Sequence, residues 1–249
     1  YYEAMNCFNF AMAQAEGVVA SAAKGLSLSK YTNYIASFQK KALEANPEGM
    51  VMAFLSNHDM DRIGGAFILD GHMRMAANLY LLAPGSPVIY YGEEIGMRGS
   101  RGGEMTDANR RLAMLWGDDD LIRNPVGSTY PADKQIQTTV ADQLEDENSL
   151  LRYYCKLLTI RHRYPAIARG DYEALNCSTN LGGFVITFEQ EQLILLHNNS
   201  AEEISITLAD QKALSTLELS QLLEYIGSGT ATLKNGVLTI GAYTSVLLQ

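Results

Sequence analysis

The chain has few cysteines, no long apolar run and a shortage of positive charge, and each shortage excludes a class of protein. Its three cysteines, Cys7, Cys155 and Cys177, are too few and too dispersed for a disulfide framework or a metal site. No apolar run reaches the roughly 18 residues that a membrane-spanning helix needs, so we expect no membrane span, and no signal-peptide pattern is visible. The sequence leaves the cellular compartment open.

Negative charge exceeds positive charge. Aspartate and glutamate number 28 against 19 lysines and arginines, which gives a net charge of -9 and a pI near 4.9. Such a surface repels phosphate groups, so we expect neither nucleic acid nor an anionic membrane as a partner. With 249 residues, 47% of them hydrophobic, the chain can bury a substantial core in one or two domains.

The most informative segment is an apolar run, residues 50–55, that ends in the polar sequence Ser56-Asn57-His58-Asp59. A run that is apolar at every position is typical of a parallel strand covered on both faces. Ligands bind at the carboxyl ends of such strands, so this cluster is a candidate site, with Asp59 as its leading member. Taken alone, the segment equally fits a turn in which Asn57 and Asp59 are turn formers or caps and His58 is a satisfied buried histidine.

A second unit repeats the order of strand and polar loop. It has the sequence GSPVIYYGEEIGM at residues 85–97, and the apolar stretch before it, residues 73–82, favours a helix. Two strands joined by a crossover helix predict a βαβ unit in a parallel sheet. Ahead of the first unit, residues 8–24 are interpreted as a strand that leads to a site loop, and residues 31–43 have the spacing of an amphipathic helix.

These two motifs carry a resemblance to a known family. FLSNHDMDR at 54–62 resembles the fourth conserved region of the α-amylase family of glycoside hydrolases, and SPVIYYGEEIGM at 86–97 resembles the last strand of that family's barrel. NRRLAMLW at 109–116 is similar to an Arg-x-Pro-Met-x-Trp signature, with Ala113 in place of the proline. The resemblance implies that residues 7–10, 50–56 and 87–91 form the sixth, seventh and eighth barrel strands.

The resemblance also implies roles for individual residues. Family members are retaining enzymes with an aspartate nucleophile, a glutamate general acid and a further aspartate that stabilises the oxocarbenium-like transition state. Asp59 corresponds to that further aspartate, and His58 to a residue that hydrogen-bonds the same sugar ring. Asn57 is expected to support the site, Arg62 to contact a sugar subsite and Tyr91 to bind substrate. The implied substrates are α-glucans such as starch, maltodextrin or related malto-oligosaccharides.

The nucleophile and the general acid have no counterpart in the sequence. No string has the Gly-x-Arg-x-Asp-Ala character of the nucleophile region. A complete barrel of eight βα units takes about 250 residues, and only about three units fit before the change of pattern near residue 166. We therefore expect the C-terminal portion of a larger hydrolase whose N-terminal part of the barrel is missing, and a chain that is inactive by itself.

Two alternatives remain open. Asp59 and Glu93 or Glu94 could form their own acid and nucleophile, although the two glutamates are expected instead to bond backbone amides of the glycine-rich loop or to support the site. The second alternative is a non-catalytic amylase-like module that binds glycans or accompanies a transporter.

The predicted fold class is α/β plus all-β, a partial TIM (β/α)8 barrel followed by an antiparallel β-sandwich. The barrel part is assigned to residues 1–165 and the sandwich to 166–249. A helix over 150–164 ends the first part, with capping residues before it and a basic end before Pro165. Seven short strands follow, and Asn235-Gly236 predicts a tight hairpin between two of them.

The long polar segment at 98–143 is expected to be functional or mobile. In it, Trp116 fits either a sugar-stacking platform or a core position. The acidic triplet at 118–120 is interpreted as a solvated turn, because a calcium loop needs ligands spread over several turns. We expect no cofactor in this chain, and the family resemblance allows Ca²⁺ in the complete parent through ligands upstream.

Overall fold

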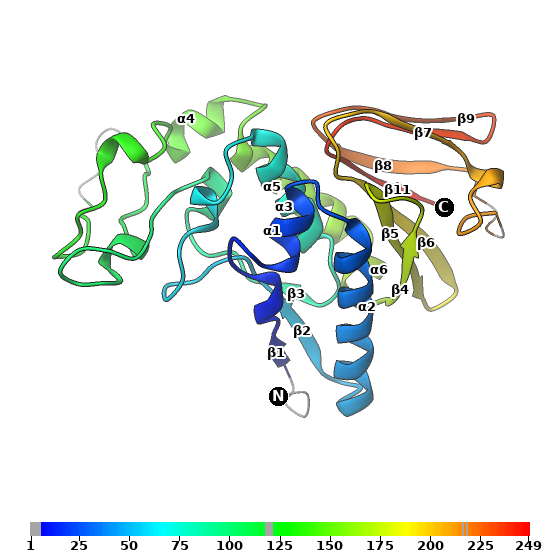
Figure 1. The fold of residues 1–249 in the computed structure, drawn as a ribbon, viewed down its shortest axis with the longest axis horizontal. Helices are drawn as coiled ribbons and strands as arrows, with labels where there is room; N and C mark the ends of the chain where they lie inside the picture. Colours follow the sequence, from blue (N-terminus) through cyan, green and yellow to red (C-terminus); the bar gives the residue numbers. More distant parts are fainter. Residues whose placement is uncertain (1–5, 118–121, 216, 218) are drawn as a thin grey trace.

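The computed structural model describes residues 6–117, 122–215, 217 and 219–249. It has the predicted architecture, in which a part of an α/β barrel is followed by antiparallel sheets (Figure 1). In the described part of the chain, no helix is long and apolar enough to cross a membrane. The predicted division between residues 165 and 166 falls between α5 (Leu150–Arg163) and α6 (Ala166–Arg169), and as a domain boundary it stays a prediction.

The barrel part is a parallel sheet with the strand order β1 (Asn6–Phe8), β2 (Met50–Ala53), β3 (Ser86–Pro87). Cys7 aligns with Val51 in one pair, and Met52 aligns with Ser86 in the other. The crossovers contain α2 (Leu28–Ala45) and α3 (Asp70–Leu81), as the two predicted βαβ units require. The three strands do not close into a barrel within the described residues.

The observed strands are shorter than the sequence indicated. Pro87 has no N–H with which to extend the ladder, and beyond it the Val88 N–H donates to the Ala53 carbonyl at 2.7 Å. The strand-and-loop interpretation of residues 8–24 was wrong in its second half, because residues 18–23 form helix α1 (Val18–Ala23). Alanine is the strongest helix former, and four of the six side chains of α1 are buried against the fold.

Polar side chains satisfy the backbone groups at the ends of the helices that cover the sheet. Ser149 caps α5, where its hydroxyl accepts the Arg152 N–H, and this confirms the predicted start of that helix. Near the other end of α5, the buried Arg161 guanidinium donates to the carbonyls of Leu81 and Ala83 at 2.8 and 2.7 Å, which satisfies acceptors at the end of α3. A short helix, α4 (Val140–Glu145), precedes α5 and begins with a capping box.

The second part consists of two antiparallel sheets. The larger has the order β4 (Asp171–Asn176), β5 (Leu181–Phe188), β6 (Glu191–Asn198), β11 (Thr244–Leu248), β8 (Leu222–Gly227). The smaller has the order β7 (Ile204–Thr207), β10 (Val237–Ile240), β9 (Ala231–Lys234). Strand β8 had no clear signal in the sequence. The predicted hairpin is confirmed, since Asn235 and Gly236 have φ of 51° and 74° and join β9 to β10.

The central strands of the larger sheet are buried on both faces. Leu193 and Leu195 belong to the core that includes the helices, whereas Ile194 and Leu196 belong to the core beneath the smaller sheet. The period of two in a strand therefore divides its apolar residues between the two parts of the molecule. This shared sheet fixes the β-strands against the helices of the partial barrel.

A buried polar network crosses that boundary. His197 Nδ1 lies 2.7 Å from Ser245 Oγ, the Asn78 side-chain amide of α3 donates to the same hydroxyl at 2.8 Å, and Tyr153 of α5 donates to Asn78 Oδ1 at 2.6 Å. Burial disfavours the charged imidazole and lowers the pKa of His197 from 6.5 to about 3. His197 is therefore held neutral in the folded protein over the pH range in which a free histidine takes up a proton.

We expect this histidine to make the fold acid-sensitive. Between pH 6.5 and about 3 the unfolded chain binds a proton that the folded chain refuses, so stability falls as the pH decreases, at up to about 1.4 kcal/mol per pH unit. Urea unfolding of the H197Q variant should lose less stability than the wild type over this window. The H162Q variant, changed at an exposed position, should follow the wild type, and parallel curves for H197Q and wild type would contradict the assignment.

Candidate functional site

The turn after β2 carries the polar residues that the sequence singled out. Leu55 and Ser56 are buried, and the chain reaches the surface at Asn57. Asn57 Oδ1 accepts the Asp59 N–H at 2.9 Å, so Asn57 shapes the turn. The Asp59 side chain is 61% exposed and lies at the edge of the sheet where the parallel strands end.

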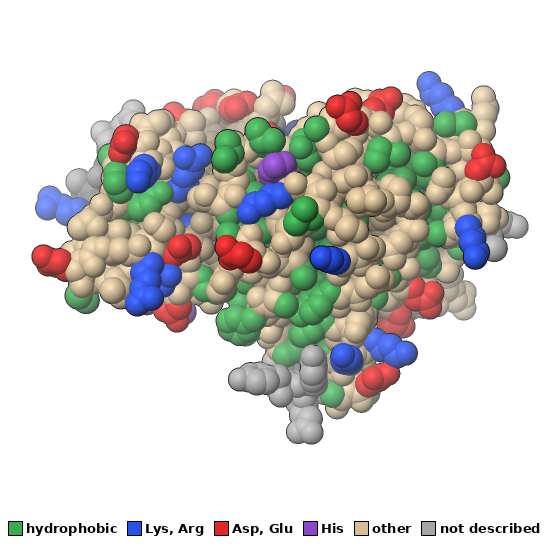
Figure 2. Space-filling model, in the orientation of Figure 1, with side chains coloured by type: hydrophobic (Ala, Val, Ile, Leu, Met, Phe, Trp, Pro, Cys, Tyr) green, Lys and Arg blue, Asp and Glu red, His purple; other side chains and the backbone are tan. Residues whose placement is uncertain are grey.

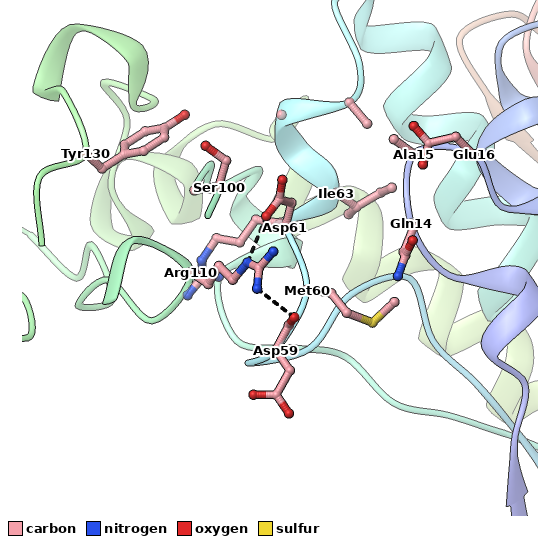
Figure 3. A pocket seen from close by; sticks show the side chains of 14 residues that line it. Gln14, Ala15, Glu16, Asp59, Met60, Asp61, Ile63, Ser100, Arg110 and Tyr130 are labelled. Atoms are coloured by element: carbon pink, nitrogen blue, oxygen red, sulfur yellow. Dashed lines mark hydrogen bonds and ion pairs between the residues drawn. The ribbon is translucent and has the colours of Figure 1, made fainter. Parts of the chain in front are cut away.

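Asp59 lines a pocket of about 370 Å³ (Figure 3). The loops that follow all three parallel strands contribute to its wall, and their polar members are Gln14, Glu16, Asp59, Asp61, Arg62, Ser100, Arg110 and Tyr130. In Figure 3 the Asp59 carboxylate points away from Ser100 and Tyr130, toward the open side of the view. The pocket confirms that the carboxyl ends of these strands meet at one polar hollow.

An imidazole and a guanidinium flank the Asp59 carboxylate. His58 Nε2 lies 3.2 Å from Asp59 Oδ2, and Arg111 Nη2 lies 2.9 Å from Asp59 Oδ1. Arg111 Nε also donates to the His58 carbonyl at 3.0 Å, so Arg111 holds both residues. An exposed carboxylate held in this way can accept hydroxyl groups of a ligand and can stabilise positive charge that develops beside it. The exposure of His58 contradicts the alternative of a satisfied buried histidine.

Arg62 lies beneath the surface of the site. Its side chain is 3% exposed, and its guanidinium stacks on the rings of Tyr90 and Tyr91 at 4.6 and 4.5 Å. Nη1 donates to the Tyr91 carbonyl at 2.5 Å, and burial lowers the pKa of Arg62. Tyr91 is partly exposed and donates its hydroxyl to the Leu112 carbonyl at 2.7 Å. Arg62 therefore orients Tyr91, and the sugar contacts predicted for both residues stay predictions.

Arg110 connects the loops that follow β2 and β3. Its guanidinium lies 2.8 Å from both Asp61 Oδ1 and Asp107 Oδ1, and it donates to the Asp59 carbonyl at 2.8 Å. Arg111 aligns with the first residue of the Arg-x-Pro-Met-x-Trp signature, but the sequence predicted no site role for Arg110 or Arg111. The sequence signal that could have indicated this role is the pair of adjacent arginines in that motif. In the structure, they pair with Asp59, Asp61 and Asp107.

Glu93 is not placed to form an acid–nucleophile pair with Asp59. It is 2% exposed in a short helical turn, η3 (Glu93–Ile95), and neither Glu93 nor Glu94 lines the pocket. Burial raises the pKa of Glu93 to about 7. Its carboxylate accepts the hydroxyls of Tyr80 and Ser56 at 2.5 and 3.1 Å, not the backbone amides that the sequence analysis proposed. The alternative acid–nucleophile pair with Glu93 is therefore wrong.

The described residues contain no metal site, and Trp116 is not part of a closed core. Among the described residues, no group of three or more His, Cys, Asp and Glu side chains is arranged to hold an ion. The acidic triplet at 118–120 lies outside the described residues. Trp116 is 49% exposed, so it does not fill a closed core.

Comparisons with known proteins give two matching families. The model of the α-amylase catalytic domain matches residues 2–170, and the model of the C-terminal domain of the α-amylase SusG matches residues 181–247. The α-amylase SusG of Bacteroides thetaiotaomicron is 30% identical over 224 residues, which cover 86% of this chain and 31% of that protein.

Two further proteins are informative. The structure of Amy13B from Eubacterium rectale superimposes on the whole chain with a TM-score of 0.87 at 27% identity, and the chain covers 49% of it. The amino acid transporter heavy chain SLC3A2 of Mus musculus is 27% identical over 74% of this chain and 35% of its own length. The chain thus spans less than half of each of these proteins.

We expect Arg110 to hold the turn that carries Asp59. The R110Q variant removes an ion pair to each of two loops and a bond to the Asp59 carbonyl, and should destabilise the protein by about 1–3 kcal/mol. Urea unfolding measures this loss. R101Q, a change at an exposed arginine of the same loop, should cost less than about 0.5 kcal/mol. Equal stabilities of R110Q and R101Q would show that Arg110 does not tie the loops.

Proposed function

The chain belongs to the α-amylase family of glycoside hydrolases, and from this membership we propose that it is part of a retaining glycosidase that acts on α-glucans. The observation that carries the proposal is the Asp59 carboxylate, exposed at the carboxyl ends of three parallel strands and lining the polar pocket there. The similarity to SusG, an α-amylase, supports starch, maltodextrin or malto-oligosaccharides as substrates.

In this proposal Asp59 stabilises the transition state and does not attack or protonate the substrate. Cleavage with retention passes through an oxocarbenium-like state in which the reacting ring carries positive charge. A fixed carboxylate near that ring lowers the free energy of the charged state more than that of the neutral substrate. His58, which shares the turn and faces Asp59 at 3.2 Å, would hydrogen-bond the same ring. Asn57 supports them through the turn bond at 2.9 Å.

The nucleophile and the general acid would come from the N-terminal part of the barrel. Within the described residues, β1 and β3 each pair with β2 only, so two edges of a parallel sheet are free. Phe8 and Phe10 are exposed beside β1, as is Met50 at the start of β2, and Figure 2 shows apolar side chains gathered on this side of the molecule. Free parallel edges and exposed aromatics support further barrel strands as the missing partner.

Calcium is proposed only for the complete parent. The described residues offer no group of three or more ligating side chains, so they do not fit a calcium site by themselves, and no step of the mechanism is assigned to a metal ion. Any such site would take its ligands from the rest of the barrel.

The second candidate function is a non-catalytic amylase-like module. The similarity to the amino acid transporter heavy chain SLC3A2 favours it, because the name of that protein describes a transporter subunit and not a hydrolase. The intact sequence Asn57-His58-Asp59 and its exposed carboxylate favour the enzyme. A nucleophile aspartate and an acid glutamate in the rest of the barrel would decide between the two.

The chain by itself should have no amylolytic activity. Retaining cleavage needs an attacking carboxylate and a proton donor on opposite sides of one glycosidic bond, and Asp59 supplies neither. Purified chain incubated with soluble starch should release no reducing sugar above a buffer blank, and D59N should give the same result. Release of sugar by the chain that is lost in D59N would refute the proposal.

In the protein with the completed barrel, Asp59 should control the rate. We expect D59N to lower kcat/KM on malto-oligosaccharides by about a thousandfold, because one charge directed at the transition state is lost. Circular dichroism should be unchanged. D171N, an exposed position on β4, serves as the matched control and should retain wild-type rates. Unchanged turnover in D59N would remove Asp59 from the mechanism.

A further inference from the structure

One buried carboxylate remains without a role in the chemistry above. The Glu93 side chain accepts hydrogen bonds from three hydroxyls on three elements: Tyr80 of α3 at 2.5 Å, Ser56 after β2 at 3.1 Å and Tyr154 of α5 at 3.4 Å. Tyr80 and Tyr154 bond Oε1, whereas Ser56 bonds Oε2. Glu93 is therefore the point at which the end of β2 is connected to two helices.

The burial of this carboxylate is costly. Removal from water disfavours its charged form and raises the pKa of Glu93 to about 7, although the hydroxyls of Tyr80 and Ser56 act in the opposite direction. The charged groups that interact with it electrostatically include Glu94 of the same turn and Arg62. An apolar side chain of equal volume would fill the same space without this cost. What the carboxylate adds is the direction of its hydrogen bonds.

The directed bond to Ser56 bears on the site. Ser56 is buried and immediately precedes Asn57, whose side chain accepts the Asp59 N–H and whose carbonyl accepts the Met60 N–H at 3.3 Å. A shift of Ser56 therefore moves the first residue of the turn. Arg110 and Arg111 hold the turn at the carbonyls of Asp59 and His58, whereas Ser56 holds it from the buried side, where the chain leaves β2.

We propose that Glu93 is a positioning residue, which fixes Ser56 against α3 and α5 and thereby sets the place of the Asp59 carboxylate at the pocket. The importance of Asp59 rests on the proposed function, but the positioning itself is a property of the chain without sugar. If a sugar assay shows no role for Asp59, the positioning proposal still stands. Conversely, the positioning proposal can be wrong while Asp59 remains the carboxylate that stabilises the transition state.

The test compares two uncharged replacements of similar size. In E93Q the side-chain carbonyl can still accept from Tyr80 and Tyr154, and the amide can donate to the Ser56 hydroxyl. E93L fills the space and makes none of these bonds. Amide hydrogen exchange of Asp59 and Met60, measured in the full chain, reports on the turn, and the Leu195 amide in β6 reports on the whole fold.

We expect E93L to speed exchange at Asp59 and Met60 by about tenfold relative to the change at Leu195, and E93Q to remain within about threefold of the wild type. S56A should reproduce the E93L result at the turn, because it removes only the link between Glu93 and the turn. Y154F is the matched control, since it removes only the longest of the three bonds, at 3.4 Å, and leaves Glu93 bonded to Tyr80 and Ser56, so the turn amides should be unchanged.

A space-filling role makes different predictions. If E93L and S56A change the turn amides by no more than they change Leu195, the effect is one of global stability and the proposal is overturned. The same conclusion follows if E93Q is as damaging as E93L, or if Y154F matches S56A at the turn. Should E93L fail to fold, S56A against Y154F decides the question.

Discussion

The parallel pairing of β2 with β1 on one side and β3 on the other is the constraint on which the site depends. Strands that run in the same direction end at the same edge, so the three loops that follow them meet there. The pocket is lined by residues from all three loops, which lie between positions 14 and 130 of the chain. An antiparallel arrangement would have sent the middle loop to the opposite edge.

Two carboxylates near this edge have opposite environments. Asp59 is exposed and lies between His58 and Arg111, so it can meet a ligand. Glu93 is enclosed by hydroxyls, burial raises its pKa to about 7, and its hydrogen bonds connect Ser56 to Tyr80 of α3. Environment, and not residue type, separates the carboxylate that lines the pocket from the carboxylate that is buried behind it. Arg110 and Arg111 add the ties that hold the exposed turn in place.

The sequence predicted the parts of the structure that local pattern determines. The apolar run at 50–55, the capped helix from residue 150 and the Asn235-Gly236 hairpin are all present, because periodicity, caps and positive φ are local properties. Residues 18–23 were misassigned, since a segment of six residues is too short for its periodicity to distinguish a helix from a strand. Strand β8 was missed because its burial alternates weakly and its place depends on β11, which lies about 20 residues further along.

The sequence identified the motif residues of the candidate site, Asn57, His58 and Asp59, but not the contacts that hold them. Asp59 could be identified from a motif, but the burial of Arg62, the hydroxyl partners of Glu93 and the ties made by Arg110 depend on residues 13 to 61 positions away. The most direct measurement of the central claim is a crystal structure of the completed barrel with a bound malto-oligosaccharide. We expect an Asp59 carboxylate oxygen to lie within about 2.6–3.2 Å of a hydroxyl of the ring at the cleavage point. A sugar bound in the cleft with Asp59 still paired to Arg111 and no hydroxyl in reach would contradict it.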